Sequence, residues 1–345
     1  HAMKPSPVTN VQDANRVFDF LSSQPWATNM LTYVYGKQGV PTSYREQDGF
    51  GVHAYKLYND KGEYKYVKFN FRSKQGVKGL NVKEAAEQQG KDFNHLTNDL
   101  YNNIYAGNFP KWDLYIQVLD PKDLGKFDFD PLDPTKIWPT ELVPETKVGT
   151  LTLNRMPKNF FNETEQSAFA PGNLVPGIEP SEDRLLQGRI FSYSDTQMYR
   201  LGVNHQQIPV NRPVIDVNNN NQDGSMNVSE RNSDVNYEPS RKEPKAATAK
   251  ARALQTPLSG YVQQIGVKEQ NFKQAGDLYR SYTTKEKDDL IMNLAADLGS
   301  VKDSETKHIM LSYFYKADAD YGMRMTKAVN GDIAIVKAKA AKLKD

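Results

Sequence analysis

The 345-residue chain contains no cysteine, which excludes disulfide bonds, thiolate metal ligands and cysteine nucleophiles. It has only five histidines, and none of them share the close spacing of a zinc motif. No apolar run approaches the roughly 20 residues of a membrane helix, so a soluble protein is expected. The 44 basic and 42 acidic residues nearly balance, which makes nucleic acid a poor candidate partner. No targeting signal is recognisable, and the compartment, cytoplasmic or periplasmic, stays open.

Four segments of the first half alternate apolar and polar residues as β-strands do. Two of them form a hairpin within 51–73, with NDKG as its turn, and the others lie at 112–120 and 147–154. On the first strand His53 shares a face with Tyr55 and Leu57, so a buried or half-buried histidine is expected. A small closed barrel has about eight strands, so this antiparallel unit lacks strands that a barrel would need.

Helical patterns surround and follow these strands. Capping boxes at Asn81 with Glu84 and at Thr283 with Glu286 mark helix starts. From Asn211 to about residue 260 the chain is polar and aperiodic, which predicts either an extended wrapping segment or disorder. We therefore expect an α+β protein with three parts: a β unit with helical insertions at 1–155, a wrapping segment at 156–262 and a C-terminal helical domain at 263–345.

The stretch RLLQGRIFSYSDTQMYRLG, residues 184–202, carries the most specific pattern. If it is helical, Arg189, Tyr193 and Arg200 lie on one face, at steps of four and seven. A guanidinium within hydrogen-bonding reach of a phenol favours the phenolate, which is a hard anionic metal ligand. Packing and surface polar contacts are the commoner role of such pairs, and spacing alone leaves both readings open.

Three segments resemble the haem-containing monofunctional catalases: GFGVHAYKL (49–57), FDFDPLDPTKIWP (127–139) and the stretch from Leu153 to Pro213 that contains RIFSY. The resemblance is very specific in the middle of the chain and extends over nearly all of it. It implies a catalase-like fold with the second half of an antiparallel β-barrel, because family chains begin well upstream of the residue that aligns with His1. The front half of the barrel is expected as a missing N-terminal part.

The resemblance also implies a haem b cofactor, with Tyr193 as the tyrosinate ligand of the iron; catalase is the standard example of this ligation. Arg189 would donate to the phenolate oxygen, and Arg200 would meet a haem propionate. His53 and Asp183 match a histidine and an aspartate that the family links to the proximal arginine. Four further positions align with residues near the haem: Phe20, Phe169, Leu185 and Gln197, the last where many catalases have histidine.

The implied reaction is dismutation of hydrogen peroxide to water and dioxygen by an interlocked homotetramer. The family's distal histidine lies upstream of this sequence, so no residue here is assigned that role. Two alternatives remain open: a haem-binding fragment without turnover, and a related enzyme for organic hydroperoxides. A tight NADPH site is not expected, because only one basic residue, Arg72, is retained among the matching positions, the others being Asn29, Gly36, Asn70 and Thr140.

Overall fold

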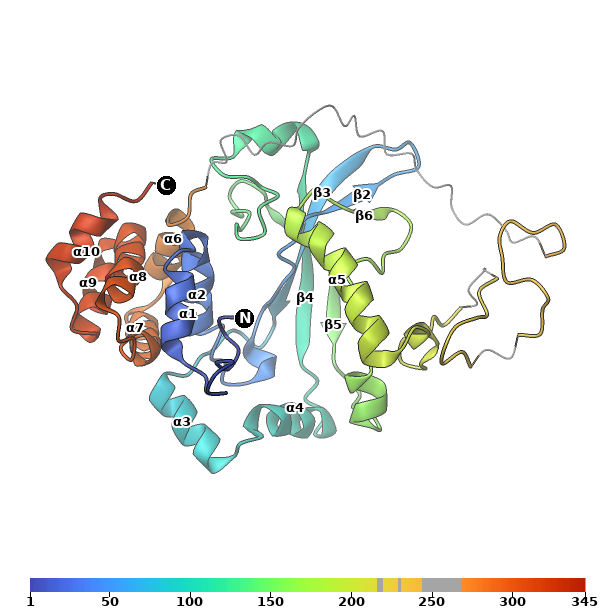
Figure 1. The fold of residues 1–345 in the computed structure, drawn as a ribbon, viewed down its shortest axis with the longest axis horizontal. Coiled ribbons are helices and arrows are strands. Elements are labelled where there is room, and N and C mark those ends of the chain that lie inside the picture. The colour runs from blue at the N-terminus through green and yellow to red at the C-terminus, as the bar shows by residue number, and fades with distance from the viewer. Residues whose placement is uncertain (216–219, 229–230, 244–268, 345) are drawn as a thin grey trace.

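The computed structural model describes residues 1–215, 220–228, 231–243 and 269–344, and its centre is an antiparallel sheet (Figure 1). The strands run in the order β5-β4-β3-β2-β6, and β1 also pairs with β3. Their bounds are β1 Gly49–Phe50, β2 Tyr55–Tyr58, β3 Tyr64–Ser73, β4 Lys111–Leu119, β5 Glu145–Thr152 and β6 Ile178–Pro180. The four expected strands are confirmed. The sequence missed β1 and β6 because strands of two and three residues are too short to show alternation.

The two faces of the sheet differ in character. One face carries apolar side chains of β3 and β4, and on it Val118 and Leu151 are exposed. The other face is polar and is covered by the segment between β4 and β5, which contributes Phe127, Phe129 and Trp138 to a small core. Gln117 Nε2 holds this covering segment on the sheet by donating to the carbonyl oxygens of Trp138 at 2.9 Å and of Val143 at 2.6 Å. The apolar face is therefore the less completely covered side of the sheet.

Lys68 is a buried cation beneath this cover. Its Nζ donates to the Lys136 carbonyl oxygen at 2.9 Å and lies 5.1 Å from the centre of the Trp138 ring. Burial lowers the pKa of Lys68 to about 8, against the opposing attraction of nearby carboxylates. Since the unfolded chain keeps the ordinary lysine pKa, it binds more protons than the folded chain between pH 8 and about 10.4. Stability from this group should therefore rise with pH across that window.

We expect Lys68→Met to remove this rise. The shift corresponds to about 3 kcal/mol between the two ends of the window, with a slope near 1.4 kcal/mol per pH unit. Urea unfolding at several pH values between 7 and 10.5 measures the slope. Lys65→Met is the matched control, because Lys65 lies on the same strand with an exposed side chain. An equal slope in Lys68→Met and in the unaltered protein would contradict the assignment.

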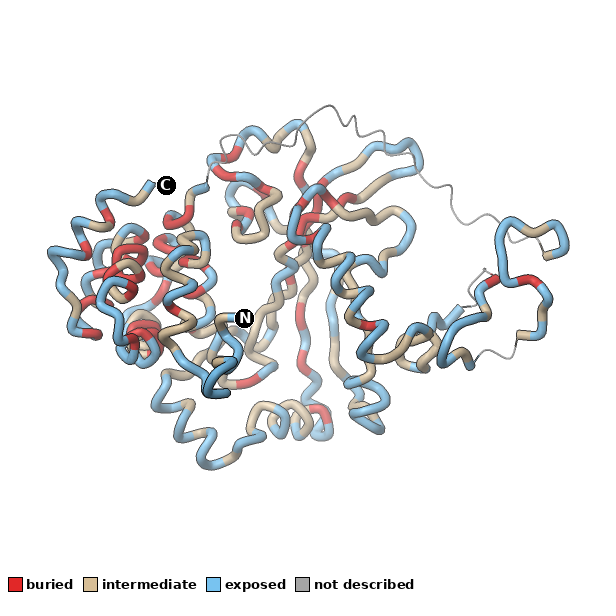
Figure 2. Tube along the Cα trace, in the orientation of Figure 1, coloured by how far each residue is buried: buried red, intermediate tan, exposed pale blue. Residues whose placement is uncertain are grey.

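The larger core is helical and unites two distant parts of the chain. Helices α1 (Ala14–Leu21) and α2 (Thr28–Tyr35) pack against the C-terminal helices through Phe18 and Leu31. The C-terminal helices are α6 Lys273–Ser281, α7 Thr284–Leu298, α8 Ser304–Ala317, α9 Ala319–Ala328 and α10 Ile333–Ala340. Figure 2 shows most buried positions gathered in this helical cluster and along the central strands. The first helices thus belong to the helical core, although the sequence placed them in the β unit.

The remaining helices follow their predicted signals. Helices α3 (Val82–Lys91) and α7 start with the two predicted capping boxes, and α4 spans His95–Tyr105. The motif-bearing helix is α5, Arg184–Leu201. Within 220–228 and 231–243 the structure has no helix or strand, in keeping with the polar sequence, and these residues project away from the sheet (Figure 1). The rest of the predicted wrapping segment, at 216–219, 229–230 and 244–262, lies outside the described residues.

Candidate functional site

Helix α5 is held at its N-terminus by a buried carboxylate. Asp183 Oδ1 accepts hydrogen bonds from the backbone N–H groups of Leu185 at 2.9 Å and Leu186 at 3.1 Å. Leu186 anchors the first turn, since its side chain is fully buried. The helix ends before Gly202, whose φ of 108° lies in the region that favours glycine. The Asp183 cap, the buried Leu186 side chain and Gly202 thus set where helix α5 begins and ends.

The predicted arginine–tyrosine pair forms in the structure. Arg189 Nη2 donates to Tyr193 Oη at 2.8 Å, and the guanidinium carbon lies 4.9 Å from the ring centre. Both side chains are half-buried. The phenol oxygen therefore has a cationic donor, and the tyrosine side chain remains partly accessible. Such an oxygen can serve as an anionic ligand, because the guanidinium stabilises its negative charge.

A buried histidine–aspartate pair supports the start of the same helix. His53 lies just before β2, rather than within it as expected, and its Nδ1 is 2.6 Å from Asp183 Oδ2. The residues are 5% and 1% exposed, so water does not compete for this bond. His53 Nε2 is buried and has no hydrogen-bond partner among the residues that the structure describes. Neither residue hydrogen-bonds to Arg189 in the part of the chain that the structure describes.

Arg200 makes four hydrogen bonds within the described residues. It donates to Gln197 Oε1 through Nε at 3.0 Å and Nη2 at 2.6 Å, and to the carbonyl oxygens of Glu165 at 3.0 Å and Ser167 at 2.7 Å. Four of its five N–H donors are used, which leaves one on Nη1. Gln197 Nε2 in turn donates to the Phe169 carbonyl oxygen at 3.1 Å. Arg200 and Gln197 thus tie the preceding loop to α5.

The sequence did not predict the structure of the loop that Arg200 and Gln197 contact. It begins with a π-helix, Phe161–Glu165, whose C-terminal carbonyl group is one of the acceptors for Arg200. π-Helices are rare and often mark functional segments. Its only sequence signal is the polar run NETEQ, which is also typical of an ordinary turn. The contact between loop and helix becomes visible only in three dimensions.

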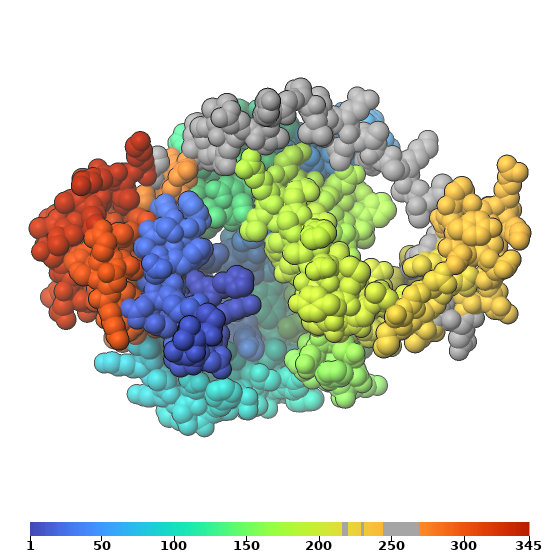
Figure 3. Space-filling model, viewed as in Figure 1, coloured from blue at the N-terminus to red at the C-terminus, as the bar shows by residue number. Residues whose placement is uncertain are grey.

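The three large apolar side chains that the resemblance placed near the haem are exposed. Phe169 is 82% exposed, Leu185 55% and Phe20 53%. Leu185 shares a stripe with Arg189, Tyr193 and Gln197, at successive steps of four along α5. Figure 3 shows the surface hollowed between α5 and the helices α1 and α2. Phe20 belongs to α1. A planar apolar group with a metal at its centre fits this donor set and these exposed side chains.

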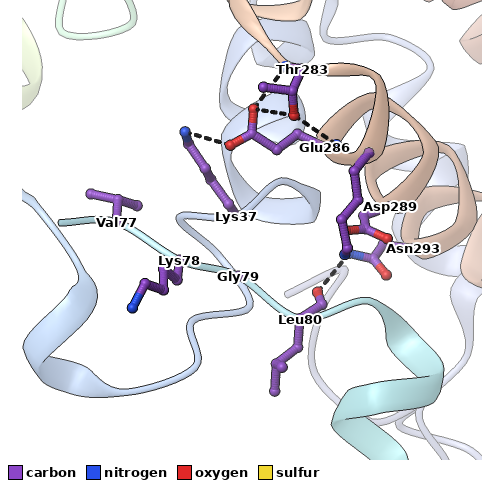
Figure 4. Close-up of a pocket in the computed structure, with 10 residues that line it drawn as sticks. Lys37, Val77, Lys78, Gly79, Leu80, Thr283, Glu286, Asp289 and Asn293 are labelled. Carbon is purple, nitrogen blue, oxygen red and sulfur yellow. Dashed lines mark hydrogen bonds and ion pairs between the residues drawn. The ribbon is translucent and has the colours of Figure 1, made fainter.

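Another hollow, of about 330 Å³, lies between residues 77–80 and the start of α7 (Figure 4). Its lysines already face carboxylates: Lys37 Nζ lies 2.8 Å from Glu286, and Lys285 Nζ lies 2.6 Å from Asp289. Within the described part of the chain, both of these lysines thus have a carboxylate partner. Within the described ranges, no three His, Asp or Glu side chains gather as a metal site. No helix among the described residues could cross a membrane.

Comparison with known proteins gives a consistent result. Residues 1–244 match the family model "Catalase", and residues 266–329 match "Catalase-related immune-responsive". A catalase of Vibrio vulnificus strain YJ016 is 60% identical over 99% of this chain and 68% of its own length. A catalase of Pseudomonas aeruginosa is 58% identical over 100% of this chain and 67% of its own length.

Solved structures agree in fold. A fungal catalase superposes with a TM-score of 0.87 at 32% identity, covering 96% of this chain and 68% of its own. A bacterial catalase gives 0.85 at 31% identity, covering 100% of this chain and 69% of its own. The resemblance that the sequence carried in its middle segments therefore extends to the whole described fold.

Proposed function

The chain belongs to the catalase family of oxidoreductases, and from this premise we propose that it dismutates hydrogen peroxide at a haem b held by Tyr193. The observation that carries the proposal is the 2.8 Å bond from Arg189 Nη2 to Tyr193 Oη on α5. When bound, haem supplies the redox chemistry with peroxide. Tyr193 would supply the anionic proximal ligand, and Arg189 would donate a hydrogen bond to its oxygen.

The other residues of the site would orient Tyr193 and Arg189. Asp183 caps α5 and binds His53, so the pair would fix the start of the helix relative to the sheet. Phe20, Phe169 and Leu185 would cover the apolar faces and edges of the macrocycle, which accounts for large apolar side chains left in solvent. The free N–H on Arg200 Nη1 would reach a propionate, and Gln197 would keep that guanidinium in place.

Proton transfer on the opposite face needs a further acid–base group. The three internal histidines outside the helix cap are engaged elsewhere: His95 Nε2 with the Thr42 carbonyl oxygen, His205 Nδ1 with that of Gly202, and His308 with Ser304 and the Asp332 N–H. We therefore assign the distal role to none of them. We infer that the distal histidine, and the strands that would cover the exposed Val118 and Leu151, come from outside residues 1–345.

Two further features bear on the oligomeric state and on NADPH binding. Residues 220–228 and 231–243 project from the sheet, as a segment that wraps another subunit of a homotetramer would (Figure 1). Arg72, the one basic residue retained for NADPH, is already paired, with Glu145 at 2.6 Å and Asp48 at 3.2 Å. A nucleotide phosphate would have to displace both carboxylates, which argues against a tight NADPH site.

The deciding experiment measures the absorption spectrum and oxygen evolution of the haem-supplied chain, with and without the N-terminal third of the Vibrio vulnificus relative. We expect a ferric tyrosinate spectrum in both samples and oxygen evolution only when the added segment is present. A spectrum without oxygen in either sample would favour a haem-binding fragment. Turnover of organic hydroperoxides with little hydrogen peroxide turnover would favour the related enzyme class. Absence of any haem spectrum would overturn the proposal.

A further inference from the structure

Helix α5 holds alternate residues of the stretch 165–169, which starts at the last residue of the π-helix and which we call the edge loop. Arg200 donates to the carbonyl oxygens of the first and third residues, Glu165 at 3.0 Å and Ser167 at 2.7 Å. Gln197, which is 7% exposed, donates from Nε2 to the carbonyl oxygen of the last residue at 3.1 Å. The last turns of α5 therefore fix three of the five residues of the edge loop.

Asn211 holds the two residues in between. Its Nδ2 donates to the Gln166 carbonyl oxygen at 2.9 Å, and its Oδ1 accepts from the Ala168 N–H at 2.8 Å. The same Nδ2 donates to the His205 carbonyl oxygen at 3.1 Å, in the turn that follows α5. Asn211 thus joins the segment before α5 to the segment after it, across 45 and 43 residues of sequence in the two loop contacts.

The bonds of Arg200 fix its guanidinium without neutralising its charge. Their acceptors are the Gln197 amide oxygen and two backbone carbonyl oxygens, all of which are uncharged. A long arginine side chain loses conformational entropy when a ligand immobilises it, which weakens binding. Here the side chain is held before any ligand binds, while its positive charge stays available to an anion. This arrangement suits an arginine that receives a carboxylate.

The positions of the two carbonyl acceptors of Arg200 depend on Asn211. Gln166 lies between the two accepting residues, and Ala168 directly follows the second one. Without Asn211, the Gln166 carbonyl and the Ala168 N–H would turn toward water, because a polar backbone group needs a partner. Neighbouring peptide groups share a Cα atom, so the carbonyl groups that bind Arg200 would turn as well.

We propose that Asn211 is a positioning residue of the haem site, which orders the edge loop so that Arg200 presents its free Nη1 N–H to a haem propionate. The inference rests on the proposed function, which places a propionate at Arg200. Asn211 itself would not contact the haem. Its replacement should weaken the hold on the edge of the macrocycle and leave the Tyr193 ligand beneath the iron unchanged.

The test measures the transfer of haem from the loaded protein to an excess of apomyoglobin, followed by absorption. We expect Asn211→Ala to release haem about tenfold faster than the unaltered protein. A tenfold change corresponds to about 1.4 kcal/mol, near the net contribution of one hydrogen bond. The ferric tyrosinate spectrum before mixing should be the same in both proteins, because the bond from Arg189 to Tyr193 does not involve the edge loop. General loosening of the fold would change the spectrum and the release rate together.

Asn204→Ala is the matched control. Asn204 Nδ2 also donates to two distant carbonyl oxygens, those of Asp223 at 3.2 Å and Ser225 at 2.7 Å, and neither belongs to the edge loop. Haem release from this variant should equal that from the unaltered protein. Asn211→Asp serves if Asn211→Ala folds poorly: it keeps the side-chain volume and the acceptor for the loop N–H but cannot donate to either carbonyl oxygen. It should also release haem faster.

A double-variant cycle tests whether Asn211 acts through Arg200. Arg200→Ala should release haem faster by itself, and the addition of Asn211→Ala should change that rate by less than about twofold. Effects that multiply in the double variant would overturn the positioning role and leave the catalase function intact, as would equal rates in Asn211→Ala and Asn204→Ala. Absence of haem binding in the unaltered protein would overturn both proposals.

Discussion

Tyr193→Phe is expected to abolish the ferric tyrosinate absorption and oxygen evolution together. The substitution removes a single oxygen atom, the acceptor of the 2.8 Å bond from Arg189 Nη2. Without it the proposed iron has no anionic proximal ligand, and none of the neighbouring side chains on α5 can replace it. Loss of a group that only supports a metal ligand costs 10–100-fold, and loss of the ligand itself should cost more. Absorption spectroscopy and an oxygen electrode measure both consequences in the same sample.

Two further variants test whether the effect of Tyr193→Phe is specific to the ligand oxygen. Tyr199→Phe removes a phenol from the same helix, and Tyr199 is 79% exposed, so both readouts should be unaffected. Arg189→Gln keeps a hydrogen-bond donor but removes the charge, so haem should remain bound with activity about 10–100-fold lower. If Tyr193→Phe kept the spectrum of the unaltered protein, another residue would be the ligand and the site assignment would be wrong.

The sequence predicted those parts of the site in which the interaction is local along the chain. Arg189 and Tyr193 are four residues apart, so helix geometry alone brings them together, and the capping boxes followed from similar local rules. Strands β2 to β5 were also predictable, because each is long enough to show alternation.

Contacts between distant segments needed the structure. The sequence alone favoured an ordinary core histidine at position 53, and the resemblance linked it to Arg189. Only the structure shows its bond to Asp183, 130 residues away. Nothing local indicated that Arg200 donates to carbonyl groups 33 and 35 residues earlier. The packing of α1 and α2 with the C-terminal helices was missed for the same reason. An apolar stripe on a helix indicates which face is buried, but it does not identify the element that this face packs against.

Asp183→Ala is the second substitution for which we expect a large effect, because the Asp183 carboxylate both caps helix α5 and binds His53. Oδ1 caps α5 through the Leu185 and Leu186 N–H groups, and Oδ2 holds the buried His53 ring. Loss of the cap costs about 1 kcal/mol, and a buried histidine without its acceptor costs about 1–3 kcal/mol. We expect urea unfolding to show a free energy lower by about 2–4 kcal/mol, and activity to fall about 10–100-fold.

Asp183→Asn separates the two contributions. The amide oxygen can still accept from the helix N–H groups, so the capping energy should be kept, since asparagine caps helices as well as aspartate does. The negative charge beside His53 is lost, so the support that this pair gives to the start of α5 should weaken. Asp183→Asn should therefore recover at least the capping part of the stability lost in Asp183→Ala while its activity stays low. Full recovery of activity in Asp183→Asn would mean that Asp183 acts through helix capping alone and that the charge beside His53 has no part in positioning the ligand.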